Sequence, residues 1–193
     1  MANAKAERKE KSRERILTSA GALMRERGIS NASVADVMGG ADMTVGGFYA
    51  HFPSKRELVV EALRETLRNS RALLAAGAAG KKGAEWVGDV VRAYLSRSHR
   101  DNPQAGCPLP AVLGEVARED AAVREALAAE IGAMADELAV HLEEAGAADP
   151  AGGAVAVLST MVGGLTLARA LAGTPLSDDV LRSCRLFLER STA

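Results

Sequence analysis

The chain has 193 residues and a formal net charge of −1, with 48% hydrophobic and 25% charged residues. This is the composition of a globular protein, which excludes a disordered or fibrous chain, and the length suffices to bury a core without disulfides or metals. Aromatic residues are only 3% of the chain, while Ala, Leu, Glu and Arg are abundant, so the composition favours an all-α fold.

Cysteine usage and the lack of a leader indicate a cytoplasmic protein. Cys107 and Cys184 lie far apart without a CxxC motif, and only three histidines accompany them, so we expect neither a disulfide framework nor a metal site, and no cofactor. The charged start, MANAKAERKEKSRER, lacks the apolar stretch of a signal peptide. Residues 151–168 carry no charge, but their many small residues favour close helix packing over a membrane span.

Charge is divided unevenly along the chain. Residues 1–72 contain 13 Lys and Arg against 9 Asp and Glu, a net of +4, whereas residues 73–193 contain 11 against 16, a net of −5. A basic N-terminal part is typical of a surface that meets a polyanion. The densest run interleaves acids with bases, and we interpret it as a solvated helix face. It comprises Glu7, Arg8, Lys9, Glu10, Lys11, Arg13, Glu14 and Arg15.

Four helices are predicted in the N-terminal part. Apolar spacing predicts a helix over 12–27 that ends at Gly28. Ser33 with Asp36 resembles a capping box for a two-turn helix ending at residues 39–40. Thr44 can cap a second short helix, VGGFYAHF, which Pro53 ends, and the Ser54 to Glu57 capping box opens a helix of about 22 residues.

Five more helices are predicted beyond a glycine-rich boundary at residues 76–84, giving about nine in total. They cover residues 87–95, then 109–116 after the loop HRDNPQAGCP, then 123–145. Asp149 followed by Pro150 opens the next helix, which we expect to end near Gly173. Ser177, with two aspartates after it, opens the last.

Two short helices joined by a tight turn have the order of a helix-turn-helix DNA reader. The second helix of such a motif enters the major groove, where small residues let the backbone approach the bases. Gly46 and Gly47 meet that need, at a cost of about 1 kcal/mol each relative to Ala in a helix. The alternative is an ordinary helical hairpin in which both glycines only form turns.

The run GISNASVADVMGGADMTVGGFYAHFPSKREL resembles the DNA-binding signature of TetR-family transcriptional regulators. The residues in register are Gly28, Ser33, Val34, Val37, Ala41, Thr44, Gly46, Phe48, Tyr49, His51, Phe52, Ser54, Lys55 and Leu58. Asp42 departs from the family's usual Gly; it tolerates left-handed geometry but adds mild repulsion near phosphate. The resemblance implies a helix-turn-helix domain over 1–53, a connecting helix over 54–76, and a ligand-binding and dimerisation domain over 77–193.

The resemblance also implies roles for individual residues, with double-stranded operator DNA as the partner. Val45, Gly46 and Gly47 fall at base-edge positions, where apolar contact and DNA shape carry the specificity. The expected phosphate contacts are Ser33, Thr44, Tyr49, His51 and Lys55. Phe48 and Phe52 are expected to be core residues.

For the C-terminal part, the resemblance implies an apolar pocket for a small-molecule inducer and a homodimer formed by the last two helices. The large or adaptable side chains there are the candidate pocket residues, although core packing explains each of them equally simply. They are Trp86, Tyr94, Cys107, Met134, His141 and Met161. The implied function is a repressor that the inducer releases from its operator by a population shift.

Three alternatives remain open. Cys107, at a predicted helix N-terminus, could sense oxidants or electrophiles, or be a small buried hydrophobe. A helical thiol enzyme would use Cys107 with His99 and Glu115, but the spacing gives that arrangement no support, so we do not expect an enzyme. A regulator that activates, or that responds to a protein partner, would use the same DNA contacts.

Overall fold

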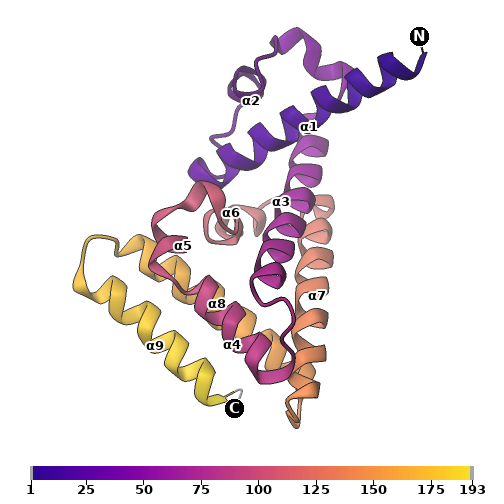
Figure 1. The fold of residues 1–193 in the computed structure, drawn as a ribbon. Helices are drawn as coiled ribbons and strands as arrows, with labels where there is room; N and C mark the ends of the chain where they lie inside the picture. Colours follow the sequence, from indigo (N-terminus) through magenta and orange to yellow (C-terminus); the bar gives the residue numbers. More distant parts are fainter. Residues whose placement is uncertain (1, 192–193) are drawn as a thin grey trace. The chain divides into compact units, whose positions relative to one another are not determined.

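A computed structural model describes residues 2–191 of the protein and confirms the all-α prediction. These residues form nine α-helices and two 3-10 helices, η1 and η2, without a strand (Figure 1). Contacts divide the chain into two compact units, of which unit 1 comprises Met1–Arg68 with Cys107–Leu127, and unit 2 comprises Asn69–Gly106 with Ala128–Ala193. Residues 107–127 thus group with the N-terminal part, whereas the sequence-based division assigned them to the C-terminal domain.

Unit 1 is built around α1 (Ala2–Arg27), α2 (Val34–Gly40), η1 (Val45–Ala50) and the first part of α3 (Lys55–Gly77). It also contains α6 (Leu109–Val116) and the start of α7 (Ala121–Glu144). Its core includes Ile16, Met24, Met38, Phe48, Phe52 and Leu63, all fully buried. The α1 helix begins ten residues before the predicted start at Ser12, because its first turns bury nothing and leave no apolar pattern to detect.

Two of the three predicted caps in the N-terminal part formed, and the third did not. The Ser33 hydroxyl accepts a hydrogen bond from the Asp36 backbone N–H, and the Ser54 hydroxyl accepts one from Glu57. Thr44 precedes η1 but makes no capping bond, and the segment is a 3-10 helix rather than the predicted α-helix. Consecutive glycines weaken α-helix formation, and the tighter 3-10 turn suits so short a segment.

Unit 2 contains α4 (Gly83–Tyr94), α5 (Arg97–Asp101), η2 (Pro103–Ala105), most of α7, α8 (Pro150–Ala170) and α9 (Pro175–Ser191). The predicted loop HRDNPQAGCP instead contains part of α5 and η2, because the Ser96 hydroxyl caps α5 by accepting from His99. The α9 helix begins before the predicted cap at Ser177, whose buried hydroxyl donates to the Ala168 carbonyl and ties α9 to α8.

The α8 helix begins as predicted, with the Asp149 carboxylate accepting from the Gly152 N–H, and ends at Ala170, slightly before Gly173. By length and composition it could cross a membrane, but one stripe of the helix is buried within unit 2. Figure 1 shows α8 and α9 side by side along their length. A Cβ added at Gly164 would lie 2.9 Å from the Cys184 sulfur, so this glycine allows the close approach of the two helices.

Candidate nucleic-acid interface

The η1 segment presents one apolar and one aromatic side chain to solvent while two phenylalanines fix it to unit 1. Val45 is 51% exposed and Tyr49 is 76% exposed, whereas Phe48 and Phe52 are buried, as predicted for core residues. The Phe48 and Phe52 rings stack with centroids 5.9 Å apart. The Tyr49 ring meets the edge of the buried Phe48 ring, with centroids 5.2 Å apart, but most of its surface stays in solvent.

The two glycines of η1 are not required by packing inside the protein. A Cβ at Gly46 would meet no heavy atom of the described chain within 4 Å, and one at Gly47 would make only an ordinary contact, 3.8 Å from the Met38 Cε. Neither has the positive φ that would demand glycine. The space that they leave therefore lies on the outside, where a ligand surface can come close to the backbone.

The turn between α2 and η1 is closed by backbone and side-chain contacts. Asp42 adopts a φ of 53°, the left-handed geometry predicted for it. Its carboxylate accepts a hydrogen bond from Arg15 of α1 at 2.9 Å. The repulsion expected between this carboxylate and phosphate is therefore offset by Arg15. Sequence reasoning missed this pair because the two residues are 27 positions apart and no local pattern links them.

The residues predicted to contact phosphate differ in their exposure and in the hydrogen bonds that they already make within the protein. The Thr44 side chain is exposed and makes no capping bond. The Ser33 hydroxyl is already engaged, since it accepts from the Asp36 N–H and donates to the Asp36 carboxylate at 2.6 Å. His51 and Lys55 are half-buried, and the His51 Nδ1 is buried without a hydrogen-bond partner in the described chain.

Glu115 of α6 holds the chain at the end of α1, a role that the sequence did not reveal. Its carboxylate accepts hydrogen bonds from the backbone N–H groups of Ile29 at 3.0 Å and Ser30 at 2.7 Å. Partial burial opposes ionisation of Glu115, but these hydrogen bonds outweigh it and lower the pKa of the carboxyl. The bonds are possible because Gly28 has a φ of +80° and no side chain; a Cβ there would lie 1.9 Å from the Glu115 Oε1.

Five of the six predicted pocket residues lie in unit 2, and Cys107 lies in unit 1. Trp86, Tyr94, Met134 and Met161 are buried, and the Trp86 ring stacks on His141 with centroids 4.0 Å apart. The His141 Nδ1 is hydrogen bonded to the Glu144 carboxylate at 3.0 Å. These contacts bring Trp86 and His141 together between α4 and α7.

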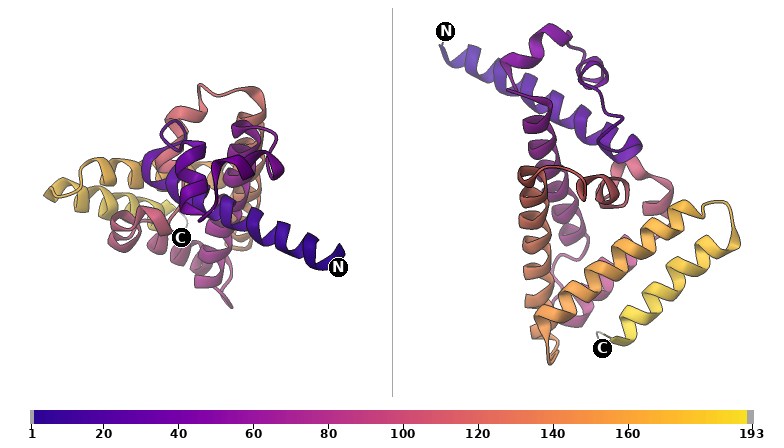
Figure 2. Two further views of the ribbon diagram at one scale, coloured as in Figure 1. Left: turned by 90° about the horizontal axis from the view of Figure 1, so that it is seen from above. Right: turned by 180° about the vertical axis from the view of Figure 1, so that it is seen from behind.

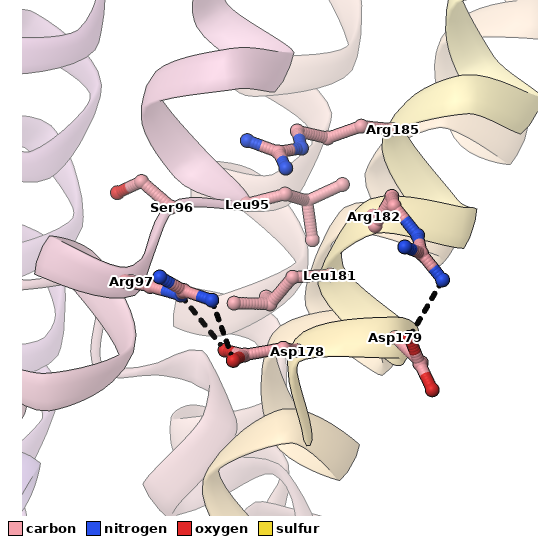
Figure 3. Close-up of a pocket in the computed structure, with 8 residues that line it drawn as sticks. All are labelled: Leu95, Ser96, Arg97, Asp178, Asp179, Leu181, Arg182 and Arg185. Atoms are coloured by element: carbon pink, nitrogen blue, oxygen red, sulfur yellow. Dashed lines mark hydrogen bonds and ion pairs between the residues drawn. The ribbon is translucent and has the colours of Figure 1, made fainter. Parts of the chain in front are cut away.

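A hollow of about 390 Å³ in unit 2 has a different character from the apolar pocket that the resemblance implies (Figure 3). Its lining residues include none of the predicted pocket residues; they are Leu95, Ser96, Arg97, Asp178, Asp179, Leu181, Arg182 and Arg185. Arg97 pairs with Asp178, and Arg182 with Asp179 at 2.7 Å. Leu95 and Leu181 also line the hollow, so it offers a ligand a surface shared by ion-paired and apolar side chains.

Comparison with known families covers both parts of the chain. Residues 16–62 match the model described as bacterial regulatory proteins, tetR family. Residues 83–183 match the model described as the tetracyclin repressor-like C-terminal domain, which by itself spans more than half of the chain. A comparison with curated proteins finds no match.

Solved structures share the fold over nearly the whole length. A TetR transcriptional regulator from Chloroflexus aurantiacus is 23% identical with a TM-score of 0.79, and the match covers 95% of each chain. One from Agrobacterium tumefaciens is 22% identical with a TM-score of 0.77, covering 96% of this chain and 100% of that one. The reduced form of Escherichia coli NemR is 19% identical with a TM-score of 0.78, covering 94% and 97%.

Proposed function

The chain belongs to the TetR family of bacterial regulatory proteins and is a DNA-binding transcriptional regulator, and we propose that it is a repressor released from its operator by a small molecule. The observation that carries the DNA-binding part is the outer face of η1. There, Val45 and Tyr49 are exposed on a glycine-containing backbone that two buried phenylalanines hold in place.

In this proposal the exposed face of η1 enters the major groove. Val45 contacts base edges through its methyl groups, and Gly46 and Gly47 let the backbone come close. The hydroxyl groups of Thr44 and Tyr49 donate hydrogen bonds to phosphate oxygens, and the ammonium group of Lys55 adds a positive charge. Ser33 and His51 complete the predicted set, Ser33 through its backbone N–H because its hydroxyl is engaged by Asp36.

The proposed homodimer forms through α8 and α9. These helices expose five large apolar side chains: Val155, Leu167, Leu176, Leu186 and Phe187. An uncovered apolar face of this kind is typical of a surface buried between subunits. A dimer places two η1 segments on DNA, as successive major grooves on one side of the duplex require.

The proposed effector site lies in unit 2, among the buried side chains of Trp86, Tyr94, Met134 and Met161 and the half-buried His141 that stacks on Trp86. A ligand there releases DNA only if it binds more tightly to a conformation in which the two η1 segments no longer match the helical repeat of DNA. The prediction concerns these residues and leaves the chemical identity of the inducer to experiment.

The test uses a duplex selected by the protein from a random-sequence library, with affinity measured by fluorescence anisotropy. We expect Val45→Ala and Tyr49→Ala to weaken binding to the selected duplex by at least about ten-fold, the effect of losing one specific contact. Val140→Ala is the matched control, because Val140 is 55% exposed but belongs to unit 2. Equal affinities for Val45→Ala and Val140→Ala would contradict the assignment of η1 as the DNA-reading element.

Oxidant sensing through Cys107 is a second candidate, favoured by its position near Arg25. The pKa of the Arg25 guanidinium is lowered, because the effect of partial burial exceeds that of the electrostatic interaction with Cys107, which acts in the opposite direction. Cationic neighbours favour a reactive thiolate, but Cys107 is 2% exposed, which restricts access to an oxidant. We expect that peroxide leaves DNA binding unchanged in both the wild type and Cys107→Ser; release in the wild type alone would establish the sensor.

The groups required for a thiol enzyme are engaged elsewhere. The Glu115 carboxylate binds the backbone of residues 29 and 30, and the His99 Nδ1 is hydrogen bonded to the Tyr94 carbonyl at 2.7 Å. These contacts occupy the carboxylate and one of the ring nitrogens that the thiol-enzyme alternative would use.

A further inference from the structure

The first turns of α1 bury no side chain over residues 4–11. Residues 4–11 are all exposed, and the first α1 side chain with a recorded tertiary contact is Arg13, which pairs with Glu61 of α3. In both views of Figure 2 these turns extend beyond α2 and η1 of the same unit. Core burial therefore does not account for this part of the chain.

Charges on this part of α1 form two separate stripes. Arg8, Lys11 and Arg15 recur at intervals of three and four residues, so they share one face of the helix. The acids Glu7, Glu10 and Glu14 repeat the same spacing one residue earlier, which places them about 100° around the helix. Lys5 and Lys9 flank the basic stripe on its other side.

The outer end of this cationic surface is unfavourable for the isolated protein. Lys5 lies in the first turn of α1, where a cation opposes the helix dipole, and that turn contains no acid to compensate. Across the described residues, Lys5, Arg8, Lys9 and Lys11 make no ion pair. A local arrangement that costs stability without a compensating contact marks a surface kept for a partner.

The stripe is continuous with the segment assigned to DNA. Arg15, at its inner end, is hydrogen bonded to Asp42 in the turn that leads into η1. Arg8 lies seven residues further out, about 10 Å along the helix axis, and Lys5 about 15 Å. Duplex DNA presents a charge about every 1.7 Å of its axis, so a strip of this length spans several phosphates.

We propose that the basic stripe of α1 (Arg8, Lys11 and Arg15), together with the flanking Lys5 and Lys9, binds the phosphate backbone of duplex DNA next to the bases that η1 reads. This inference rests on the proposed role of η1 and extends the DNA-binding surface beyond the helix-turn-helix. The contacts are to phosphate, so they add affinity and salt dependence without adding sequence preference.

The test compares two double variants with the same change in net charge. Arg8→Gln with Lys11→Gln removes two cations from the stripe, and the control Lys82→Gln with Arg190→Gln removes two exposed cations from unit 2. Binding to the selected duplex with about ten extra base pairs on each side is measured at several salt concentrations. We expect the stripe variant to lower the salt slope by roughly 1.8 per protomer and the affinity at low salt by at least about ten-fold.

A second duplex, trimmed to the selected site, separates local contact from overall charge. On the trimmed duplex the wild type and the stripe variant should bind alike, and on the long duplex amide exchange of residues 4–11 should slow. Both variants should keep a melting temperature close to that of the wild type, because all four cations are exposed and none of them makes an ion pair within the described residues. If the stripe variant matches the control on the long duplex, the stripe does not bind DNA, although η1 still does. If the wild type binds neither duplex, the proposed function itself is wrong.

Discussion

Unit 1 and unit 2 expose large apolar side chains in different surroundings. Unit 1 exposes Val45 and Tyr49, both on η1. Unit 2 exposes seven, of which five lie on α8 and α9 and the other two are Leu73 and Val140. Around Val45 and Tyr49 the surface carries a hydroxyl, glycines and cations, whereas the face of α8 and α9 adds small residues such as Gly152 and Gly163.

The proposed function assigns the first surface to DNA and the second to another copy of the chain. A small apolar contact surrounded by donors suits DNA, where base edges are read within a frame of phosphates. A broad apolar face along two helices suits another protein surface, where burial of area provides the stability. Substitutions in the two surfaces should therefore differ in their effects: those on α8 and α9 should change assembly, and those on η1 should change DNA affinity.

The largest expected effect comes from placing charge on the α8 and α9 face. Leu167→Glu with Phe187→Glu should convert the protein to a monomer, because two carboxylates would be buried at the proposed interface. Loss of the second DNA contact should then reduce operator affinity by at least about 100-fold, the scale of bivalent binding. Sedimentation velocity measures the first effect and anisotropy the second.

Leu73→Glu is the control for this variant. Leu73 is 67% exposed, more than Leu167 or Phe187, but it lies on α3. It should leave both the mass of the particle and the DNA affinity unchanged. A dimeric Leu167→Glu, Phe187→Glu protein would show that the exposed face of α8 and α9 is not the subunit interface.

The next effect concerns the stability of unit 1. Gly28→Ala should lower the free energy of unfolding by about 3 kcal/mol, since it imposes strain at positive φ and displaces the charged acceptor of two backbone hydrogen bonds. Gly80→Ala measures the backbone strain alone, because Gly80 has the same φ of +80° and an added Cβ there would meet nothing within 4 Å among the described residues. Equal losses for both variants in urea unfolding would mean that Glu115 contributes nothing measurable.

Contacts between neighbours in sequence were predictable, and those between distant residues were not. Ser33 and Asp36 are three residues apart, so their capping bond follows from the sequence alone. Glu115 and Ile29 are 86 residues apart, and no pattern at either position indicates their hydrogen bond. Periodicity detects only elements that bury a face, which is why the first turns of α1 were missed. At Thr44 the start of the short helix was predicted correctly, but the capping bond did not form and the glycines after it favoured a tighter helix.

A smaller effect distinguishes the two explanations for the η1 glycines. Gly46→Ala should leave stability unchanged or slightly increased, because its Cβ would meet no described atom, while reducing operator affinity by about ten-fold if the backbone lies against bases. Gly132→Ala provides the comparison, since a Cβ on this glycine of α7 likewise meets nothing within 4 Å of the described chain. Unaltered affinity in Gly46→Ala would indicate that both glycines only shape the turn.

The smallest expected effect concerns Asp42, whose carboxylate is paired with Arg15. Asp42→Asn keeps a residue that tolerates positive φ but removes the carboxylate that now accepts from Arg15. Arg15 then becomes available to phosphate, so operator affinity should rise about three-fold at low salt, the scale of one exposed ion pair, and the gain should fade as salt is added. Asp179→Asn removes another exposed carboxylate, paired with Arg182 in unit 2, and controls for net charge. If both variants raise affinity equally, the effect of Asp42 is one of overall charge, and Arg15 does not reach DNA.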